Sequence, residues 1–218
     1  MKTIGILGGM GSYATADFFK RLIDAFPAEK EWDRPRILID NNCVMPSRVR
    51  AILYNEKVDE LILQMSQSVN ALSDSGADII MMGCMTAHHF ISYLPHQDKL
   101  VNVTLLLKDA MRNEKKVLVL CTEGSMAAKV WDYALPDLKR IYPDENQMKE
   151  LRRFIEIVKT GMIKEHNKRE FADFVNTLPC ETVLLGCTEL PILADKELFE
   201  KKIYDPIECA INYLKEMV

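Results

Sequence analysis

Short apolar runs recur along the chain and alternate with amphipathic stretches. Continuous apolar runs of this length are typical of strands that are covered on both faces, as in a parallel sheet. The runs that predict strands are TIGILGG (3–9), RILIDNN (36–42), ADIIMMGC (77–84), LVNVT (100–104), KVLVLCTEG (116–124) and ETVLLGC (181–187). Helical spacing of apolar residues predicts helices at 14–26, 58–76 and 147–161. Strands that alternate with helices indicate an α/β fold whose sheets are mainly parallel.

A faint internal repeat favours two similar halves. The stretch ILGGMGS at 6–12 matches VLCTEGS at 119–125 with an offset of 113, and Cys84 matches Cys187 with an offset of 103. The different offsets imply that about ten residues are missing between the matched points of the second half. Two buried strands can resemble each other by chance, so the repeat alone leaves that alternative open.

The repeat predicts two pseudo-symmetric domains, each a mainly parallel sheet flanked by helices. We expect residues 1–98 and a returning helix at 206–218 to form the first domain, and residues 99–205 to form the second. Pro95 and the pair Asp205-Pro206 mark the two crossings. Ligands of open α/β sheets bind beyond the carboxyl ends of the strands. The expected active site therefore lies in the cleft between the domains.

The glycine-rich stretch GGMGS at 8–12 follows the first predicted strand. Glycines at such a position permit a tight turn and a close approach of the backbone to a ligand. The spacing G-x-G-x-x-G of a dinucleotide-binding fold is absent, and the nearest suitable acidic residue, Asp40, comes about 30 residues later. The stretch therefore predicts a turn, which is compatible with an anion site at the N-terminus of the next helix.

Two cysteines stand where the chemistry is expected. Cys84 and Cys187 each follow an apolar run and a glycine, and each precedes a predicted helix that carries a threonine, Thr86 or Thr188. A helix N-terminus lowers the pKa of a thiol, because its dipole favours the thiolate. Two such thiols that face each other could remove a proton from one face of a carbon and return it to the other. The alternative is that both are small buried apolar residues, as most free cysteines are.

Composition narrows the class of protein. The chain has 218 residues and a formal net charge of −4, which argues against nonspecific binding of nucleic acid. No apolar run reaches the roughly 18 residues of a membrane span, and the N-terminal run is too short for a signal peptide. The six cysteines form no C-x-x-C pair, so we expect free thiols, no metal site and a cytoplasmic location.

Five segments in order resemble the aspartate/glutamate racemase superfamily, and in particular its aspartate racemase branch. They are ILGGMGSYATADFF, NNCVMPSR, GCMTAHHF, CTEGSM and LLGCTELPIL. The resemblance extends over nearly the whole chain. It implies two pseudo-symmetric α/β domains, no cofactor, a small amino-acid or dicarboxylate substrate and a homodimer. It also implies that Cys84 and Cys187 are the two catalytic bases.

The same resemblance assigns the substrate-binding residues, which are Met10, Arg48, Met85, Thr86, Thr122, Lys159, Thr188 and Glu189. A guanidinium such as that of Arg48 suits a carboxylate. Lys159 has a rival in Lys164. His88 either tunes or orients the cysteine segment, or it only packs. Glu189 either holds a thiol or the substrate ammonium, or it is a first-turn charge that favours the helix dipole.

Met85 departs from the family pattern. The family usually has C-N-T where this chain has Cys84-Met85-Thr86, and that asparagine donates a hydrogen bond to the substrate α-carboxylate. Methionine has no donor, so either another group replaces the asparagine or the substrate differs from aspartate.

The sequence thus predicts a cofactor-independent racemase of aspartate, glutamate or a related amino acid. Two alternatives remain: an isomerase or decarboxylase of a dicarboxylate that uses the same two cysteines, and an impaired protein that only binds a small dicarboxylate.

Overall fold

The structure, a computed structural model, describes residues 1–218 and contains two parallel sheets of four strands. The first sheet has the order β2-β1-β3-β4 and the second has the order β6-β5-β7-β8. The first sheet consists of β1 (Ile4–Leu7), β2 (Ile37–Asp40), β3 (Ile79–Met82) and β4 (Leu100–Val101). The second consists of β5 (Lys116–Leu120), β6 (Lys139–Ile141), β7 (Thr182–Leu185) and β8 (Lys202–Tyr204). The predicted α/β fold with two similar halves is confirmed.

The equivalent strand order makes the two sheets pseudo-symmetric. In the first sheet β1 lies between β2 and β3, with Ile4 opposite Ile37 and Ile79. In the second sheet β5 lies between β6 and β7, and Leu118 is opposite Val183. The sequence pattern missed β6 and β8, because each has only three residues and begins with an exposed lysine.

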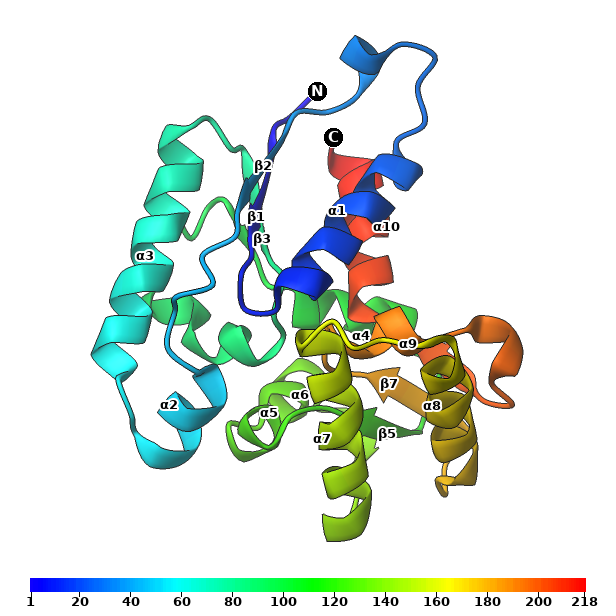
Figure 1. Ribbon diagram of the computed structural model, residues 1–218. Helices are drawn as coiled ribbons and strands as arrows, with labels where there is room; N and C mark the ends of the chain where they lie inside the picture. The colour runs from blue at the N-terminus through cyan, green and yellow to red at the C-terminus, as the bar shows by residue number, and fades with distance from the viewer.

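Helices cover both faces of each sheet (Figure 1). The longer ones are α1 (Ser12–Ala25), α3 (Val58–Asp74), α7 (Glu145–Lys159), α8 (Glu165–Thr177) and α10 (Pro206–Met217). The shorter ones are α2 (Arg48–Tyr54), α4 (Leu107–Ala110), α5 (Glu123–Ala127), α6 (Val130–Ala134) and α9 (Leu190–Leu193). Four 3-10 helices lie at Glu31–Asp33, Thr86–Tyr93, Val103–Leu106 and Lys196–Leu198. In Figure 1, α3 lies on one side of the first sheet and α1 and α10 lie on the other.

The apolar runs are continuous because alternate residues of each central strand enter different cores. In β3, Ile79 and Met81 belong to a central cluster, whereas Ile80 and Met82 pack under α3 with Leu61. The central cluster has 22 buried residues and includes side chains from both sheets. A third cluster fills the space between the second sheet and the helices α7 and α8. Burial of both strand faces explains why the pattern predicted these strands.

The C-terminal helix α10 returns to the first sheet and packs beside α1. Its first turn is capped by Asp205, whose carboxylate accepts a hydrogen bond from the Ile207 backbone N–H at 2.8 Å. Asp205 also pairs with Arg21 of α1 at 2.7 Å. We propose the division of the chain expected from the sequence, with domains at 1–98 plus 206–218 and at 99–205.

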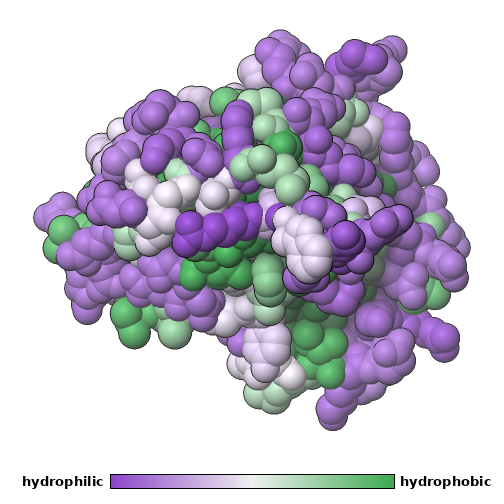
Figure 2. All heavy atoms as spheres, turned by 90° about the horizontal axis from the view of Figure 1, so that it is seen from above, coloured by the Kyte–Doolittle hydropathy of each residue, from purple (hydrophilic) through white to green (hydrophobic).

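Hydrophilic residues cover most of the face shown in Figure 2, and apolar residues form separate small groups there. None of the helices is both long and apolar enough to span a bilayer.

Candidate active site

The segments that follow β3 and β7 are hydrogen-bonded to each other across the two halves. Thr188 Oγ1 donates to the carbonyl oxygen of Gly83 at 3.1 Å. These residues are the immediate neighbours of Cys187 and Cys84, respectively. The two cysteine segments therefore meet at the carboxyl ends of the sheets, where the parallel topology places a ligand site.

The thiol of Cys187 donates to a buried carboxylate. Its Sγ lies 2.9 Å from Glu189 Oε2, and the Glu189 side chain belongs to a residue that is only 3% exposed. Thr188 Oγ1 lies 3.4 Å from the same oxygen. Of the three roles considered for Glu189 from the sequence, the geometry favours the one that holds a thiol.

Burial and the Glu189 carboxylate raise the pKa of Cys187 well above its ordinary value. The positive charge of Lys159 acts in the opposite direction and lowers this pKa, and a thiolate at Cys84 raises it. Lys159 and Cys84 are therefore both close enough to Cys187 for their charges to act on its thiol.

The lowered pKa expected from a helix N-terminus is wrong for Cys187. The helix after it, α9, has only four residues and begins at Leu190, so its dipole is small and the loss of water dominates. Cys84 likewise precedes a 3-10 helix that begins at Thr86, not an α-helix.

His88 fixes the backbone of Cys84. Its Nδ1 lies 3.0 Å from the Cys84 carbonyl oxygen, and its Nε2 accepts a hydrogen bond from the Val103 backbone N–H at 3.2 Å. A nitrogen that accepts carries no proton, so Nδ1 is the protonated donor of this neutral ring. Burial lowers the pKa of His88 to about 4, which keeps the ring neutral. His88 therefore orients the Cys84 segment.

The glycine-rich loop after β1 lies against the acidic side chain. Gly9 has a φ of 77°, which favours glycine, and thus forms the turn expected from the sequence. A Cβ atom on Gly11 would lie 2.3 Å from Glu189 Oε1. The close approach of Glu189 to this loop therefore requires a residue without a side chain at position 11.

Arg48 stands at the first turn of α2 and joins two loops. Its Nη2 donates to the Met10 carbonyl oxygen at 2.8 Å and its Nη1 donates to the Pro46 carbonyl oxygen at 3.0 Å. The Nε atom is buried and has no partner. Two of the residues assigned to the substrate, Arg48 and Met10, are thus in direct contact with each other.

Three buried hydroxyls join the halves beside Cys84. Thr86 Oγ1 lies 2.9 Å from both Thr122 Oγ1 and Ser125 Oγ. Thr122 Oγ1 lies 3.3 Å from Ser125 Oγ. The sequence assigned Thr86 and Thr122 to the site but missed Ser125, although its position three residues after the N-cap Thr122 was a usable signal.

Lys159 lies in the last turn of α7 and its side chain is 34% exposed. The capping box of Asp144 and Gln147 sets the start of this helix. Lys164, the rival predicted from the sequence, is exposed at the start of α8. Lys159 is thus the lysine whose charge acts on Cys187.

Met85 is 1% exposed and belongs to the central apolar cluster with Trp131 and Leu107. Its side chain therefore packs in the apolar core.

The site as a whole is nearly closed. Cys84 is 9% exposed and Cys187 is 6% exposed. No group of three or more His, Cys, Asp or Glu side chains is arranged to hold a metal ion.

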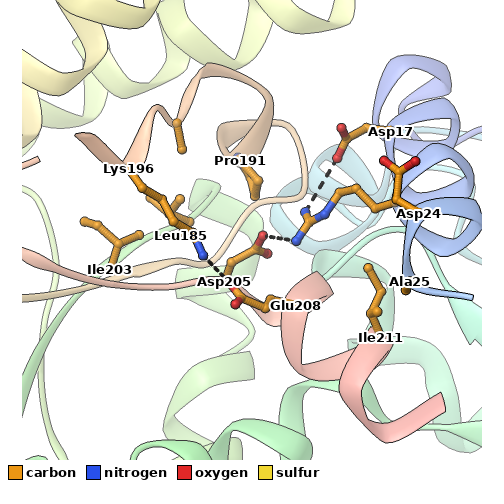
Figure 3. Close-up of a pocket in the computed structure, with 12 residues that line it drawn as sticks. Asp17, Asp24, Ala25, Leu185, Pro191, Lys196, Ile203, Asp205, Glu208 and Ile211 are labelled. Atoms are coloured by element: carbon orange, nitrogen blue, oxygen red, sulfur yellow. Dashed lines mark hydrogen bonds and ion pairs between the residues drawn. The ribbon is translucent and has the colours of Figure 1, made fainter. Parts of the chain in front are cut away.

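A surface pocket of about 480 Å³ lies elsewhere, between α1, α9 and α10 (Figure 3). None of its lining residues was assigned to the site. Its charged side chains pair with each other, as Arg21 with Asp205 at 2.7 Å and Lys196 with Glu208 at 2.9 Å. This pocket is therefore a groove between paired charges, and no cysteine lines it.

Comparisons with known proteins show which family the chain belongs to. The family model for Asp/Glu/hydantoin racemases matches residues 7–214. The broad specificity amino-acid racemase RacX of Bacillus subtilis is 22% identical over 219 residues, with 94% of this chain and 93% of that protein covered.

Two solved structures share the fold. The aspartate racemase of Picrophilus torridus has a TM-score of 0.84 and 24% identity, and the match covers 100% of this chain and 94% of that one. The glutamate racemase of Thermus thermophilus has a TM-score of 0.68 and 16% identity, and the match covers 99% of this chain and 80% of that one. The family model spans nearly the whole chain, so the protein belongs to the Asp/Glu/hydantoin racemase family and is an isomerase of the racemase type.

Proposed function

We propose that this protein is a cofactor-independent amino-acid racemase in which Cys84 and Cys187 act on opposite faces of the substrate Cα. The observation that carries the proposal is the junction of the two cysteine segments. Thr188 donates to Gly83 across the two halves, and Cys187 donates to the buried Glu189. Two thiols from different sheets, close enough to influence each other's charge, suit proton transfer on two faces.

The chemistry needs one thiolate and one thiol at the start. The thiolate removes the Cα proton, and the thiol on the other face gives its proton to the carbanion. The two cysteines then exchange roles for the reverse reaction. The raised pKa of Cys187 keeps the proton on its sulfur, which suits the role of the acid. Glu189 holds that proton on the sulfur and orients it.

Substrate entry requires an opening of the closed site. Both thiols are almost buried, and hydrogen bonds from Thr188 and Thr86 connect the halves around them. A substrate reaches the thiols when these contacts separate, and reclosure excludes water from the charged intermediate.

The substrate is an acidic amino acid or a related one. Lys159 is the cation whose charge lowers the pKa of Cys187, and its ammonium group supplies a partner for a carboxylate. Arg48 contributes if its hydrogen bonds to Met10 and Pro46 are exchanged for the ligand.

A racemase of broad specificity is the second candidate. Met85, which stands in place of the family asparagine, is buried in the apolar core and offers no donor. RacX, a relative described as having broad specificity, covers nearly the whole chain. A site with fewer fixed donors discriminates less between substrates, because a hydrogen-bonding site rejects ligands that leave its groups unpaired.

We also propose a homodimer in the cytoplasm. The resemblance implies the dimer, and all six cysteines are free thiols, which suits a reducing compartment. Light scattering coupled to size exclusion tests the dimer by its mass.

The decisive experiment is a panel of L- and D-amino acids incubated with the protein in deuterated water. A racemase replaces the Cα proton with deuterium and forms the opposite enantiomer, which NMR and chiral chromatography detect. Conversion of maleate would instead establish an isomerase of dicarboxylates, release of carbon dioxide would establish a decarboxylase, and binding without exchange would establish a binding protein.

A further inference from the structure

The three hydroxyls of Thr86, Thr122 and Ser125, here called the hydroxyl ring, can donate all of their protons to one another. The ring has three oxygen–oxygen contacts, of 2.9, 2.9 and 3.3 Å. Each hydroxyl has one proton to donate. All three contacts can be satisfied only if each hydroxyl donates once and accepts once around the ring.

The ring is almost buried, and Ser125 is its innermost member. Thr86 is 4% exposed, Thr122 is 7% exposed and Ser125 is fully buried. Ser125 Oγ has no partner outside the ring, whereas Thr122 Oγ1 also accepts the Ser125 backbone N–H at 3.1 Å as the cap of α5. Ser125 is therefore the member whose hydroxyl serves only the two threonines.

The ring also joins the two halves at the site. Thr86 follows β3 of the first sheet by way of Cys84, and the other two residues follow β5 of the second. Packing around the ring is tight, because a Cβ on Gly124 would lie 3.0 Å from Val49 Cα and 3.3 Å from Thr86 Cγ2. Helices α2 and α5 lie side by side here (Figure 1).

We propose that Ser125 is a positioning residue for catalysis, which orients the hydroxyls of Thr86 and Thr122 toward the substrate carboxylate. This inference rests on the proposed function. When one threonine turns its proton to the carboxylate, the ring opens at that contact. The oxygen of this threonine then accepts the Ser125 proton, and a hydroxyl that accepts a hydrogen bond donates a stronger one. Without Ser125 Oγ, each threonine loses its shared partner and can rotate to another rotamer.

The test compares substitutions of Ser125 with a matched buried serine. Ser68 in α3 is 2% exposed and its hydroxyl accepts only from Asn42 at 3.2 Å, so Ser68→Ala removes a buried hydroxyl that has no contact with the hydroxyl ring. We expect Ser125→Ala to raise KM about five- to tenfold, the size of one lost neutral hydrogen bond, with a smaller change in kcat. Ser125→Thr restores the hydroxyl and should return KM to within about twofold to threefold of the wild-type value. Ser68→Ala should lower Tm without a change in KM.

If Ser125→Ala does not fold, the KM of Ser125→Cys is measured in its place. This variant retains the shape but has a weak donor, so its KM should fall between the values of the Thr and Ala variants. If the wild-type enzyme is active and Ser125→Ala and Ser125→Cys have the same KM as Ser68→Ala, the role of Ser125 is overturned but the proposed function is not. A wild-type enzyme that exchanges the Cα proton of no amino acid in the panel would overturn the proposed function, and this inference with it.

Discussion

At the residue scale, Cys84 and Cys187 differ from the other four cysteines by their setting. Both follow the end of a central strand by two residues, and the threonine after each, Thr86 or Thr188, contacts the opposite half. Cys43, in contrast, is exposed on the loop after β2. Position in the fold, not burial alone, separates these two thiols from the rest, because Cys121 and Cys180 are buried as well.

Replacing either central cysteine should abolish racemisation. A serine hydroxyl is too weak an acid to exchange the proton, so Cys84→Ser and Cys187→Ser should each lower kcat by about a hundred- to ten-thousandfold. Chiral chromatography measures the loss, and Cys43→Ser is the control with near-normal turnover. Exchange of the Cα proton on one face can survive in a single variant. Full racemisation by the Cys187→Ser protein would rule out the two-base mechanism.

Removal of the Glu189 charge should lower the pKa of Cys187. The carboxylate raises this pKa both by its charge and by accepting the thiol proton, and Glu189→Gln removes the charge while its amide oxygen keeps an acceptor for the thiol. Alkylation of the Cys187 peptide, followed by mass spectrometry as the pH is raised, should begin at a lower pH in the variant. Glu181→Gln, a change at an exposed glutamate, is the matched control. An unchanged or later onset in Glu189→Gln would contradict the assigned pairing.

The substitution Met85→Asn should destabilise the protein and weaken its activity. An amide at this position would be buried in the central apolar cluster without a partner, at a cost of about 1–3 kcal/mol. Urea unfolding measures the loss of stability, with Met85→Leu as the control of similar volume. If Met85→Asn instead leaves the stability intact and increases turnover of aspartate, the side chain at position 85 faces the substrate and only the missing donor matters.

At the element scale, the 3-10 helix from Thr86 to Tyr93 is attached to the next segment by His88. Its neutral ring bridges the Cys84 carbonyl and the Val103 N–H, so a second proton on Nε2 would break the contact with Val103. This arrangement makes the setting of Cys84 sensitive to acid.

The stability of the protein should fall as the pH drops from about 6.5 to about 4. The pKa of His88 is about 4 in the folded protein and 6.5 in the unfolded chain, where water surrounds the ring. Between these values the unfolded chain binds a proton that the folded chain does not, so acid favours unfolding. The difference between the two pKa values corresponds to about 3 kcal/mol of unfolding free energy, which is lost as the pH falls from about 6.5 to about 4. Urea titrations at several pH values measure it. His88→Gln should flatten this pH dependence and exposed His166→Gln should retain it, whereas equal slopes in the two variants would refute the assignment.

At the scale of the whole molecule, the two halves share one core. The central cluster of 22 residues takes side chains from both sheets and from the returning helix α10, including Ile4, Val117 and Ile207. If one half unfolded alone, the half that stays folded would expose its part of this apolar surface to water.

The two halves should therefore unfold in one transition. In a Trp32→Phe variant, Trp131 of α6 is the only tryptophan and reports on the second half, whereas far-UV circular dichroism reports on the whole chain. The two urea curves should coincide. A midpoint for Trp131 fluorescence that is separate from the circular dichroism midpoint would show that the halves are independent.

The sequence by itself determined the central strands, the α/β class and the placement of Cys84 and Cys187 just after two of these strands. Central strands such as β3 and β7 are buried on both faces, so every residue is apolar or small and the pattern is local. The ordered motifs around Cys84 and Cys187 carried the family resemblance for the same reason: each is a short contiguous segment.

Tertiary structure alone decided the rest. The edge strands β6 and β8 exist because β5 and β7 offer them hydrogen-bonding partners, which three-residue segments with charged ends do not reveal. The pKa of Cys187 rises because the fold removes water and brings Glu189 to the thiol, effects that outweigh the short helix that follows. Ser125 joins Thr86 only when the two sheets meet, since 39 residues separate them in the chain. Burial and contacts between distant segments depend on the whole fold, and these are the quantities that set the chemistry of the site.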